Sequence, residues 1–242
     1  MQGNTISGPQ GAGTAEFIDD SSASLSYQID FENTGTVPAQ NVIVTEQLDP
    51  NLDWATFQLV SFSFGIINVS VPTGLTQYQT TVSYQNEDGS ALNVVVAADF
   101  NVVTGLLTWT FTSIDPTTGQ APTGVLDGFL PPENGTGVGE GGVAYTVQPN
   151  GGLVTGTTVT AQASIVLDTN PAISTLLWVN TIDSSPPSLV AGTTATFIRG
   201  DAIDPSSFVS GVTVALASVV NTVSLTASVA SSTTGATAQL FG

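Results

Sequence analysis

The chain has 242 residues and a formal net charge of −18, because one Lys or Arg stands against 19 Asp and Glu. A surface this acidic repels phosphate backbones and anionic lipid, which excludes nucleic-acid binding and electrostatic membrane binding. The chain has no His and no Cys, so catalytic triads, thiol chemistry and ordinary zinc sites are excluded as well. Carboxylate and carbonyl oxygens remain as metal ligands, and these suit Ca²⁺.

Only 8% of the residues are charged, whereas 41% are hydrophobic, and Thr, Ser, Val, Gly and Asn are abundant. This composition is typical of a folded β-protein rather than a disordered chain. We expect a secreted or cell-surface protein, which gains no stability from disulfides because it lacks Cys. The first residues have no basic region and no apolar region, so they are not interpreted as a signal peptide.

The first 20 residues are Gly-rich and are interpreted as an N-terminal tail. In the next segment Leu25, Tyr27, Ile29 and Phe31 alternate with polar residues, which predicts a strand over 24–31 with one buried face. The same pattern, bounded by Gly, Pro and Asn turns, predicts further strands over 42–45, 55–63, 66–71, 77–85, 91–99 and 104–113.

A long irregular segment follows over 115–142, and loops of this length are usually functional or held by other groups. Strands are expected again over 143–148, 157–167 and 174–181. The Pro186–Pro187 pair predicts a boundary, followed by strands over 189–198, 209–217, 222–229 and 236–241. The uncharged tail alternates with period two, so a membrane-spanning helix is not expected there.

No amphipathic helix is expected anywhere, and many short strands predict an all-β, immunoglobulin-like β-sandwich with extra terminal strands. A jelly-roll-like variant stays open. The predicted organisation is a tail over 1–20, a main sandwich over 21–187 and C-terminal strands over 188–242.

Two stretches carry a resemblance to a known family: YQIDFENTG at 27–35 and AQNVIVTE at 39–46. They resemble immunoglobulin-like modules of secreted bacterial and archaeal surface proteins. The region 27–187 also resembles a domain of unknown function from large secreted, often cyanobacterial, proteins, and the matching pieces lie at 52–54, 64–65, 109–111, 113–116, 128–132, 139–141, 165–168 and 180–183. The resemblance implies a secreted, adhesive or structural role and carries no catalytic motif.

Calcium is the metal that the acidic loops predict. The pattern Asp49-x-Asn51-x-Asp53 begins like a calcium loop, but Trp54 and Val60 replace the Gly and Glu that an EF-hand requires. An irregular calcium loop and an ordinary Asp-rich turn therefore both stay open. The other candidate ligands, which lie in Gly- and Asn-rich loops or at strand ends, are Asp115, Asp127, Glu133, Glu140, Asp168, Asn170 and Asp183.

Two carboxylates raise an enzymatic alternative. Asp30 and Glu32 lie two residues apart on one strand face, and a glycoside hydrolase uses a pair of carboxylates. A solvated strand face explains the same pattern without catalysis, so the protein is not predicted to be an enzyme.

Both chain ends are candidates for assembly by strand exchange. The last strands have no charges and no Pro to block strand addition, and their apolar residues include Val223, Leu225 and Val229. Phe17 and Ile18 make the N-terminal segment the other candidate donor. We therefore expect a structural subunit of an extracellular filament or matrix that self-assembles by donor-strand complementation and is stabilised by calcium. The alternative is a calcium-binding adhesion module, excised from a larger protein, that binds carbohydrate or protein.

Overall fold

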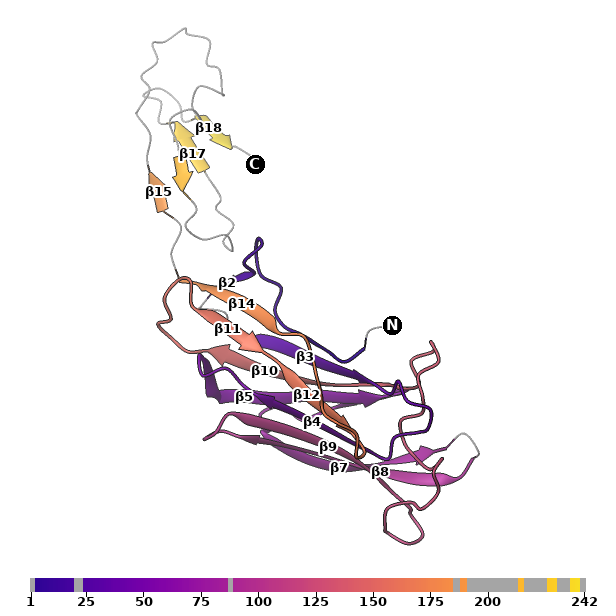
Figure 1. The fold of residues 1–242 in the computed structure, drawn as a ribbon. Coiled ribbons are helices and arrows are strands. Elements are labelled where there is room, and N and C mark those ends of the chain that lie inside the picture. Colours follow the sequence, from indigo (N-terminus) through magenta and orange to yellow (C-terminus); the bar gives the residue numbers. More distant parts are fainter. Residues whose placement is uncertain are drawn as a thin grey trace. The chain divides into compact units, whose positions relative to one another are not determined.

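The computed structural model describes residues 3–19, 24–86 and 89–184, together with four short strands between 188 and 239. The chain divides into two compact units, 1–184 and 185–242. Every regular element in the described residues is a β-strand (Figure 1). No helix in this part of the chain could cross a membrane.

The first unit contains two large sheets and one small sheet. The five-stranded sheet has the order β1 (Thr5–Ser7), β3 (Leu25–Glu32), β10 (Glu140–Pro149), β5 (Leu52–Phe64) and β6 (Ile67–Ser70). The six-stranded sheet has the order β13 (Ile173–Ser174), β12 (Ala163–Leu167), β4 (Asn41–Gln47), β9 (Leu106–Ile114), β8 (Ala91–Asn101) and β7 (Gln77–Gln85). The three-stranded sheet has the order β11 (Thr158–Ala161), β14 (Trp178–Asp183) and β2 (Phe17–Asp19).

The two large sheets pack face to face through aromatic side chains. Phe31 of β3 meets Phe111 of β9 with ring centroids 5.4 Å apart, and Phe62 of β5 lies 5.9 Å from Trp109. These contacts follow from the alternation of apolar and polar residues, because every second residue of a strand points to the same face of the sheet. The buried face predicted for 24–31 is confirmed by the burial of Leu25, Tyr27, Ile29 and Phe31. The all-β, immunoglobulin-like sandwich is thus confirmed.

The strand predicted over 157–167 is divided between two sheets. β11 pairs with β14, whereas β12 pairs with β4, and Gln162 lies between them. Ala161 and Ala163 are both buried, so the chain changes sheets without exposing its apolar side. Alternation alone cannot reveal such a change, because the residues on both sides of it keep period two.

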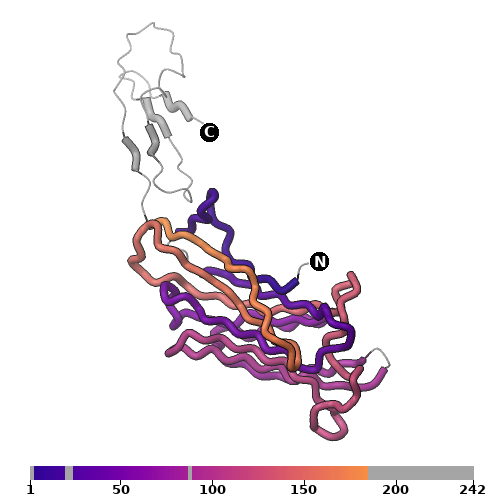
Figure 2. The backbone as a smooth tube through the Cα atoms, viewed as in Figure 1, coloured from indigo at the N-terminus to yellow at the C-terminus, as the bar shows by residue number. Residues whose placement is uncertain are grey.

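The N-terminal segment forms two short strands where the sequence predicts a loop. β1 pairs with β3, and β2 pairs in parallel with β14. Figure 2 shows this segment beside the strand over 178–183. Ile6 and Ile18 are buried, and the Asn180 amide donates to the carbonyl oxygens of Pro9 and Glu16. A three-residue strand with one buried side chain is too short to produce a periodic pattern, which explains the difference.

The long segment after β9 is irregular between Ile114 and Glu140, as expected. It is anchored by Phe129 and Leu130, which are both buried, and Leu130 forms a β-bridge with Ala39. The Asn33 side-chain amide donates to the Leu130 carbonyl at 2.8 Å. Apolar packing and one buried amide therefore hold the loop.

The second unit is described only as two strand pairs. β15 (Ser188–Val190) pairs with β16 (Thr213–Ala215), and β17 (Thr226–Val229) pairs with β18 (Ala236–Gln239). All four lie within segments predicted as strands or one residue outside them.

Candidate functional site

The predicted calcium ligands at Asp49, Asn51 and Asp53 form a structural turn. The Asp49 carboxylate accepts hydrogen bonds from the Asn51 amide and from both the amide and the hydroxyl of Thr160, each at 2.9 Å. Asp53 accepts only from the amide of Ala55. The arrangement connects the β4–β5 turn to β11, and the carboxylates lie in separate hydrogen-bond systems.

In the long loop, backbone amides hold two of the predicted ligands. Glu133 accepts from the amides of Gly137 and Gly139 at 3.0 and 2.8 Å, and these hydrogen bonds lower the pKa of its carboxyl. Asp115 accepts from the Thr117 amide at 2.7 Å, which lowers the pKa of Asp115 in the same way. A carboxylate that accepts hydrogen bonds from several amides replaces part of its hydration with protein hydrogen bonds.

The remaining predicted ligands lie in separate places. Asp168, in a left-handed conformation with φ of 53°, accepts from the amides of Gln40 and Asn41. Asn170 belongs to the turn that follows β12. Asp183 is buried at the end of β14 beside Thr155, and Asp127 lies in a turn with Gly124.

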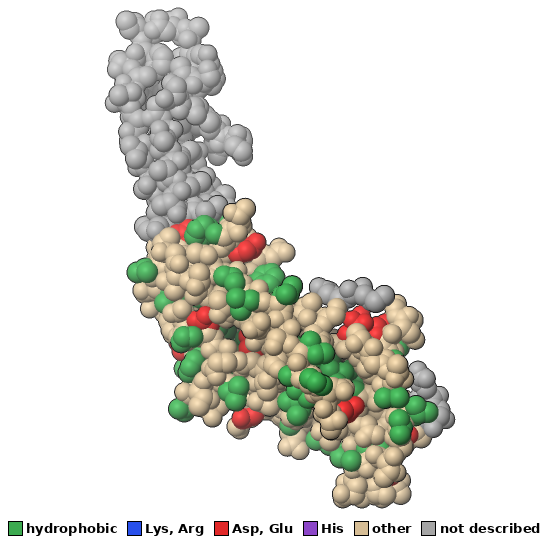
Figure 3. All heavy atoms as spheres, in the orientation of Figure 1, with side chains coloured by type: hydrophobic (Ala, Val, Ile, Leu, Met, Phe, Trp, Pro, Cys, Tyr) green, Lys and Arg blue, Asp and Glu red, His purple; other side chains and the backbone are tan. Residues whose placement is uncertain are grey.

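The structure does not bring the ten candidate ligands together. Over the described residues, no three acidic side chains form a group able to hold a metal ion. Figure 3 shows the carboxylates dispersed over one face, and Arg199, the single basic residue, lies outside the described residues. Calcium binding therefore stays a prediction based on net charge and loop composition.

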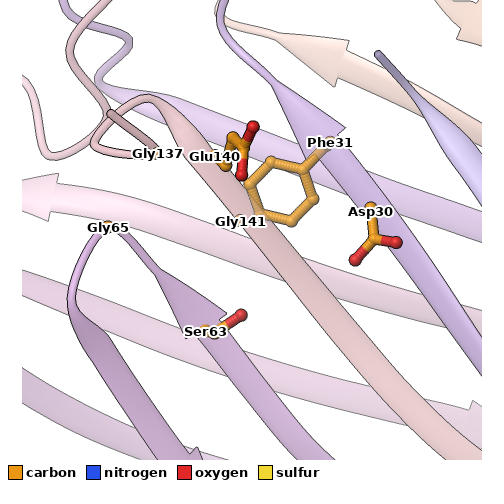
Figure 4. A pocket seen from close by; sticks show the side chains of 7 residues that line it. All are labelled: Asp30, Phe31, Ser63, Gly65, Gly137, Glu140 and Gly141. Carbon is orange, nitrogen blue, oxygen red and sulfur yellow. The ribbon is translucent and has the colours of Figure 1, made fainter. Parts of the chain in front are cut away.

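Asp30 and Glu140 line a small pocket, together with Phe31, Ser63 and three glycines (Figure 4). The cavity measures about 230 Å³, and its two carboxylates come from the neighbouring strands β3 and β10. Glu32, the other half of the catalytic pair considered above, does not line the pocket. It is 6% exposed and lies directly opposite Glu140 across the strands.

The sandwich interior contains a buried acid that was not singled out from the sequence. Glu46 of β4 is 2% exposed, and among the described residues neither of its carboxyl oxygens has a partner with hydrogen-bond geometry. Burial raises the pKa of Glu46 to about 7, although the nearby Tyr145 hydroxyl lowers it in part. The Tyr145 ring stacks on Tyr27 at 5.1 Å, and neither hydroxyl has a partner of good geometry. The sequence carries a signal for the burial of Glu46, because alternation places it on the same strand face as Val42 and Val44.

The open edges of the sheets differ greatly in length. In the first unit, the outermost strands β1, β2, β6, β11 and β13 contain two to four residues each, whereas β7 contains nine. Short edge strands are a common protection against unwanted pairing. β7 has no charge, no Pro and no register shift against β8, so its open edge lacks the usual obstacles to strand addition. It lies at the rim of the sandwich (Figure 1).

The residues proposed for terminal strand exchange have different positions. Phe17 and Ile18 pair with Thr181 and Ile182 of their own chain. Val223 and Leu225 lie outside the described residues, and Val229 pairs with Ala236 within the second unit. The sequence pattern indicates the chain ends as donors and does not reveal the open edge of β7, although the strand predicted over 77–85 is confirmed.

Comparison with known proteins gives a partial family match. Residues 3–88 match the family described as "Domain of unknown function (DUF7619)". This stretch includes the two motifs at 27–35 and 39–46, and the description assigns no activity. No curated protein matches the chain.

Similar solved structures include three fragments of bacterial surface proteins. The collagen-binding domain of a Staphylococcus aureus adhesin is 8% identical, with a TM-score of 0.36 over 75% of this chain and 97% of that one. The collagen-binding subdomain of the Enterococcus faecalis surface protein ACE is 7% identical, with a TM-score of 0.32 over 76% and 98%. The 35 kDa C-terminal fragment of the major pilin of Streptococcus agalactiae is 8% identical, with a TM-score of 0.40 over 78% and 57%.

Likeness at this level supports no argument about function. The fold class of the protein is therefore assigned from the arrangement of its own sheets. They define an all-β, immunoglobulin-like sandwich with one long, uncharged open edge.

Proposed function

We propose that this protein is a non-enzymatic structural subunit of an extracellular or cell-surface assembly, in which subunits associate through β-strand pairing. The observation that supports this most directly is the open edge of β7, nine residues long and free of charge. On a chain with a net charge of −18, a second copy meets strong repulsion at most surfaces, and an uncharged edge reduces that repulsion.

The chemistry of the described residues supports a structural role rather than catalysis. The chain has no His, Cys or Lys that could act as a nucleophile or general base. Several carboxylates, such as Asp49, Glu133 and Asp168, accept hydrogen bonds from backbone amides of their own chain. Carboxylates in these positions stabilise turns and loops, which is the task expected of them in a structural module.

We extend the proposal to strand exchange at the termini, in which each subunit donates a strand to the next. Such head-to-tail contacts would build an open-ended polymer. β2 joins its sheet through a three-residue parallel pairing with β14, a short contact that the same segment of a neighbouring subunit could replace. The C-terminal strands are the second candidate donor. Calcium completes the proposal as a counter-ion that reduces repulsion between acidic subunits.

Assembly is tested with purified protein by sedimentation velocity and negative-stain electron microscopy, in EDTA and in millimolar Ca²⁺. We expect regular oligomers or filaments that increase with calcium. Variants lacking 1–20 or 188–242 should each be imaged, since loss of filaments in one of them identifies the donor. Protein that stays monomeric at every concentration and in both buffers would contradict the proposed function.

A groove on the outer face of the six-stranded sheet favours an adhesion module as the second candidate. It measures about 480 Å³, and the partly exposed apolar side chains of Val37, Ile43 and Val125 line it. Apolar contacts of this kind bind carbohydrate or peptide ligands. A stable monomer that binds glycan or matrix-protein arrays, and loses binding in Ile43→Ser, would favour this function.

A further inference from the structure

The sequence of β7 reads nearly the same in both directions. Its residues are Gln, Tyr, Gln, Thr, Thr, Val, Ser, Tyr and Gln, from 77 to 85. Reversal about the central Thr81 places Gln77 opposite Gln85 and Tyr78 opposite Tyr84. It also places Gln79 opposite Ser83 and Thr80 opposite Val82, which are pairs of similar size or polarity.

The hydrogen bonds around β7 establish which backbone groups face the open edge. The Phe100 amide donates to the Thr76 carbonyl directly opposite, and the Asn86 amide donates to the Ser90 carbonyl directly opposite. In an antiparallel ladder such hydrogen-bonded pairs alternate along the strand. The even-numbered residues of β7 therefore bond to β8. Residues 77, 79, 81, 83 and 85 direct their amides and carbonyls away from the sheet.

No strand of the described chain lies beyond these outward groups. The backbone groups of Thr81 face outward, so a two-fold axis midway between Thr81 and its symmetry mate makes these two residues a hydrogen-bonded pair. The four other outward residues then pair with each other across the axis. A second copy of β7 in this register satisfies every outward group, with about ten intermolecular hydrogen bonds.

From this pairing register and the outward direction of the odd-numbered backbone groups, and as an extension of the proposed function, we infer that two copies of the protein associate by antiparallel β7–β7 pairing about a two-fold axis that passes between the two Thr81 residues. The pairing joins two six-stranded sheets into one continuous sheet. It is isologous, because the same surface of each copy forms the contact.

The side chains of β7 suit this partner on both faces. Tyr78, Val82 and Tyr84 pack against the core but keep part of their surface exposed. In the pair, Tyr78 of one copy lies opposite Tyr84 of the other, and such positions bring side chains close together. The outer face presents Gln77, Gln79, Thr81, Ser83 and Gln85, so no like charges are opposed.

The first test uses single Cys substitutions, which the Cys-free chain makes unambiguous. Under mild oxidation, we expect Thr81→Cys to form a covalent dimer, because its mate lies directly opposite at a distance a disulfide can span. Gln77→Cys alone should not cross-link, because its mate lies roughly 27 Å away along the paired strands. A mixture of Gln77→Cys and Gln85→Cys should form a heterodimer.

The second test uses charge. Thr81→Glu and Thr81→Lys each place like charges directly opposite in the pair, so each alone should be monomeric by sedimentation velocity. An equimolar mixture should dimerise again. Thr110→Glu, on the interior strand β9 and opposite the uncharged Ala97 and Ile43, is the control for added charge and should leave association unchanged, with circular dichroism confirming that every variant is folded.

The outcomes separate this inference from the proposed function. Covalent dimers without filaments support the β7 pair and contradict the filament. Filaments in which Thr81→Cys does not cross-link contradict the β7 pair and leave the filament standing. Self-linking of Gln77→Cys would indicate parallel pairing and would overturn the inferred register, and protein that is always monomeric overturns both.

Discussion

At the scale of single residues, Glu46 is the side chain whose environment departs most from the solvated state of a carboxylate. It faces the sandwich interior beside Tyr27 and Tyr145, with Asp49 in the adjacent turn. No cation lies among these neighbours, so burial favours the neutral form. A carboxylate with no charged partner in an apolar interior destabilises the folded state once it ionises.

The pH dependence of stability follows from the pKa of Glu46, which rises from an ordinary 4.5 to about 7 on folding. Between these values the unfolded chain is ionised and the folded chain stays protonated. The contribution of Glu46 to stability therefore falls as pH rises through this range, by about 3 kcal/mol at most, and levels off above pH 7. The Glu46→Gln variant removes the titration.

Urea unfolding at pH 4.5, 5.5, 6.5 and 7.5 measures the effect as the difference between wild type and Glu46→Gln. We expect similar stability at the lowest pH and a variant more stable by roughly 1–3 kcal/mol at the highest. Glu140→Gln at the surface pocket serves as the control. A difference that does not change with pH would mean that Glu46 is not protonated in the folded protein.

The loop carboxylate Glu133 has the opposite behaviour, because hydrogen bonds from Gly137 and Gly139 lower its pKa. Its contribution to stability is present above pH 4.5 and is lost as the pH falls and the carboxylate is protonated. Glu133→Gln should accelerate hydrogen exchange at both glycine amides without changing exchange in β9. Exchange rates from NMR measure this directly, and unchanged rates at Gly137 and Gly139 would refute it.

At the scale of elements, Asp49 connects the β4–β5 turn to β11. Asp49→Ala leaves the amide and hydroxyl of Thr160 without their acceptor. We expect a loss of about 1–3 kcal/mol in the free energy of unfolding, measured by urea denaturation. Asp53→Ala is the matched control and should cost much less, because Asp53 accepts a single local hydrogen bond. Equal losses in the two variants would exclude the connecting role of Asp49.

The elements also show where periodicity predicts structure and where it does not. The strand over 77–85 is long and regular, so its boundaries were predicted correctly. β1 and β2 escaped prediction because each depends on one buried Ile and on pairing with a distant segment. Propensity and alternation are local properties, whereas these strands exist only because β3 and β14 offer them an edge.

At the scale of the whole molecule, the charge of −18 predicts a response to cations. EDTA-treated protein should melt at a higher temperature in millimolar Ca²⁺ than in NaCl of equal ionic strength, because a bound ion stabilises the folded state by mass action. Differential scanning calorimetry measures the shift, and isothermal titration measures the heat of binding. Equal melting temperatures in the two salts would show that the charge is screened without specific calcium sites.

The sequence by itself determined the fold class and the absence of His, Cys and Lys side chains. Composition and alternation depend only on the residues of each segment, so both can be read without the tertiary structure. Most strands and the buried face of β3 follow from them.

Only the tertiary structure decided which acidic side chains lie close together and which strand forms the edge of a sheet. It dispersed the ten predicted calcium ligands, buried Glu46 against two tyrosines, and left the outer edge of β7 without a further strand among the described residues. Each of these facts depends on contacts between segments far apart in the chain. A strand's place in the sheet order, which decides whether its edge is open, is not encoded in the local pattern of the strand itself.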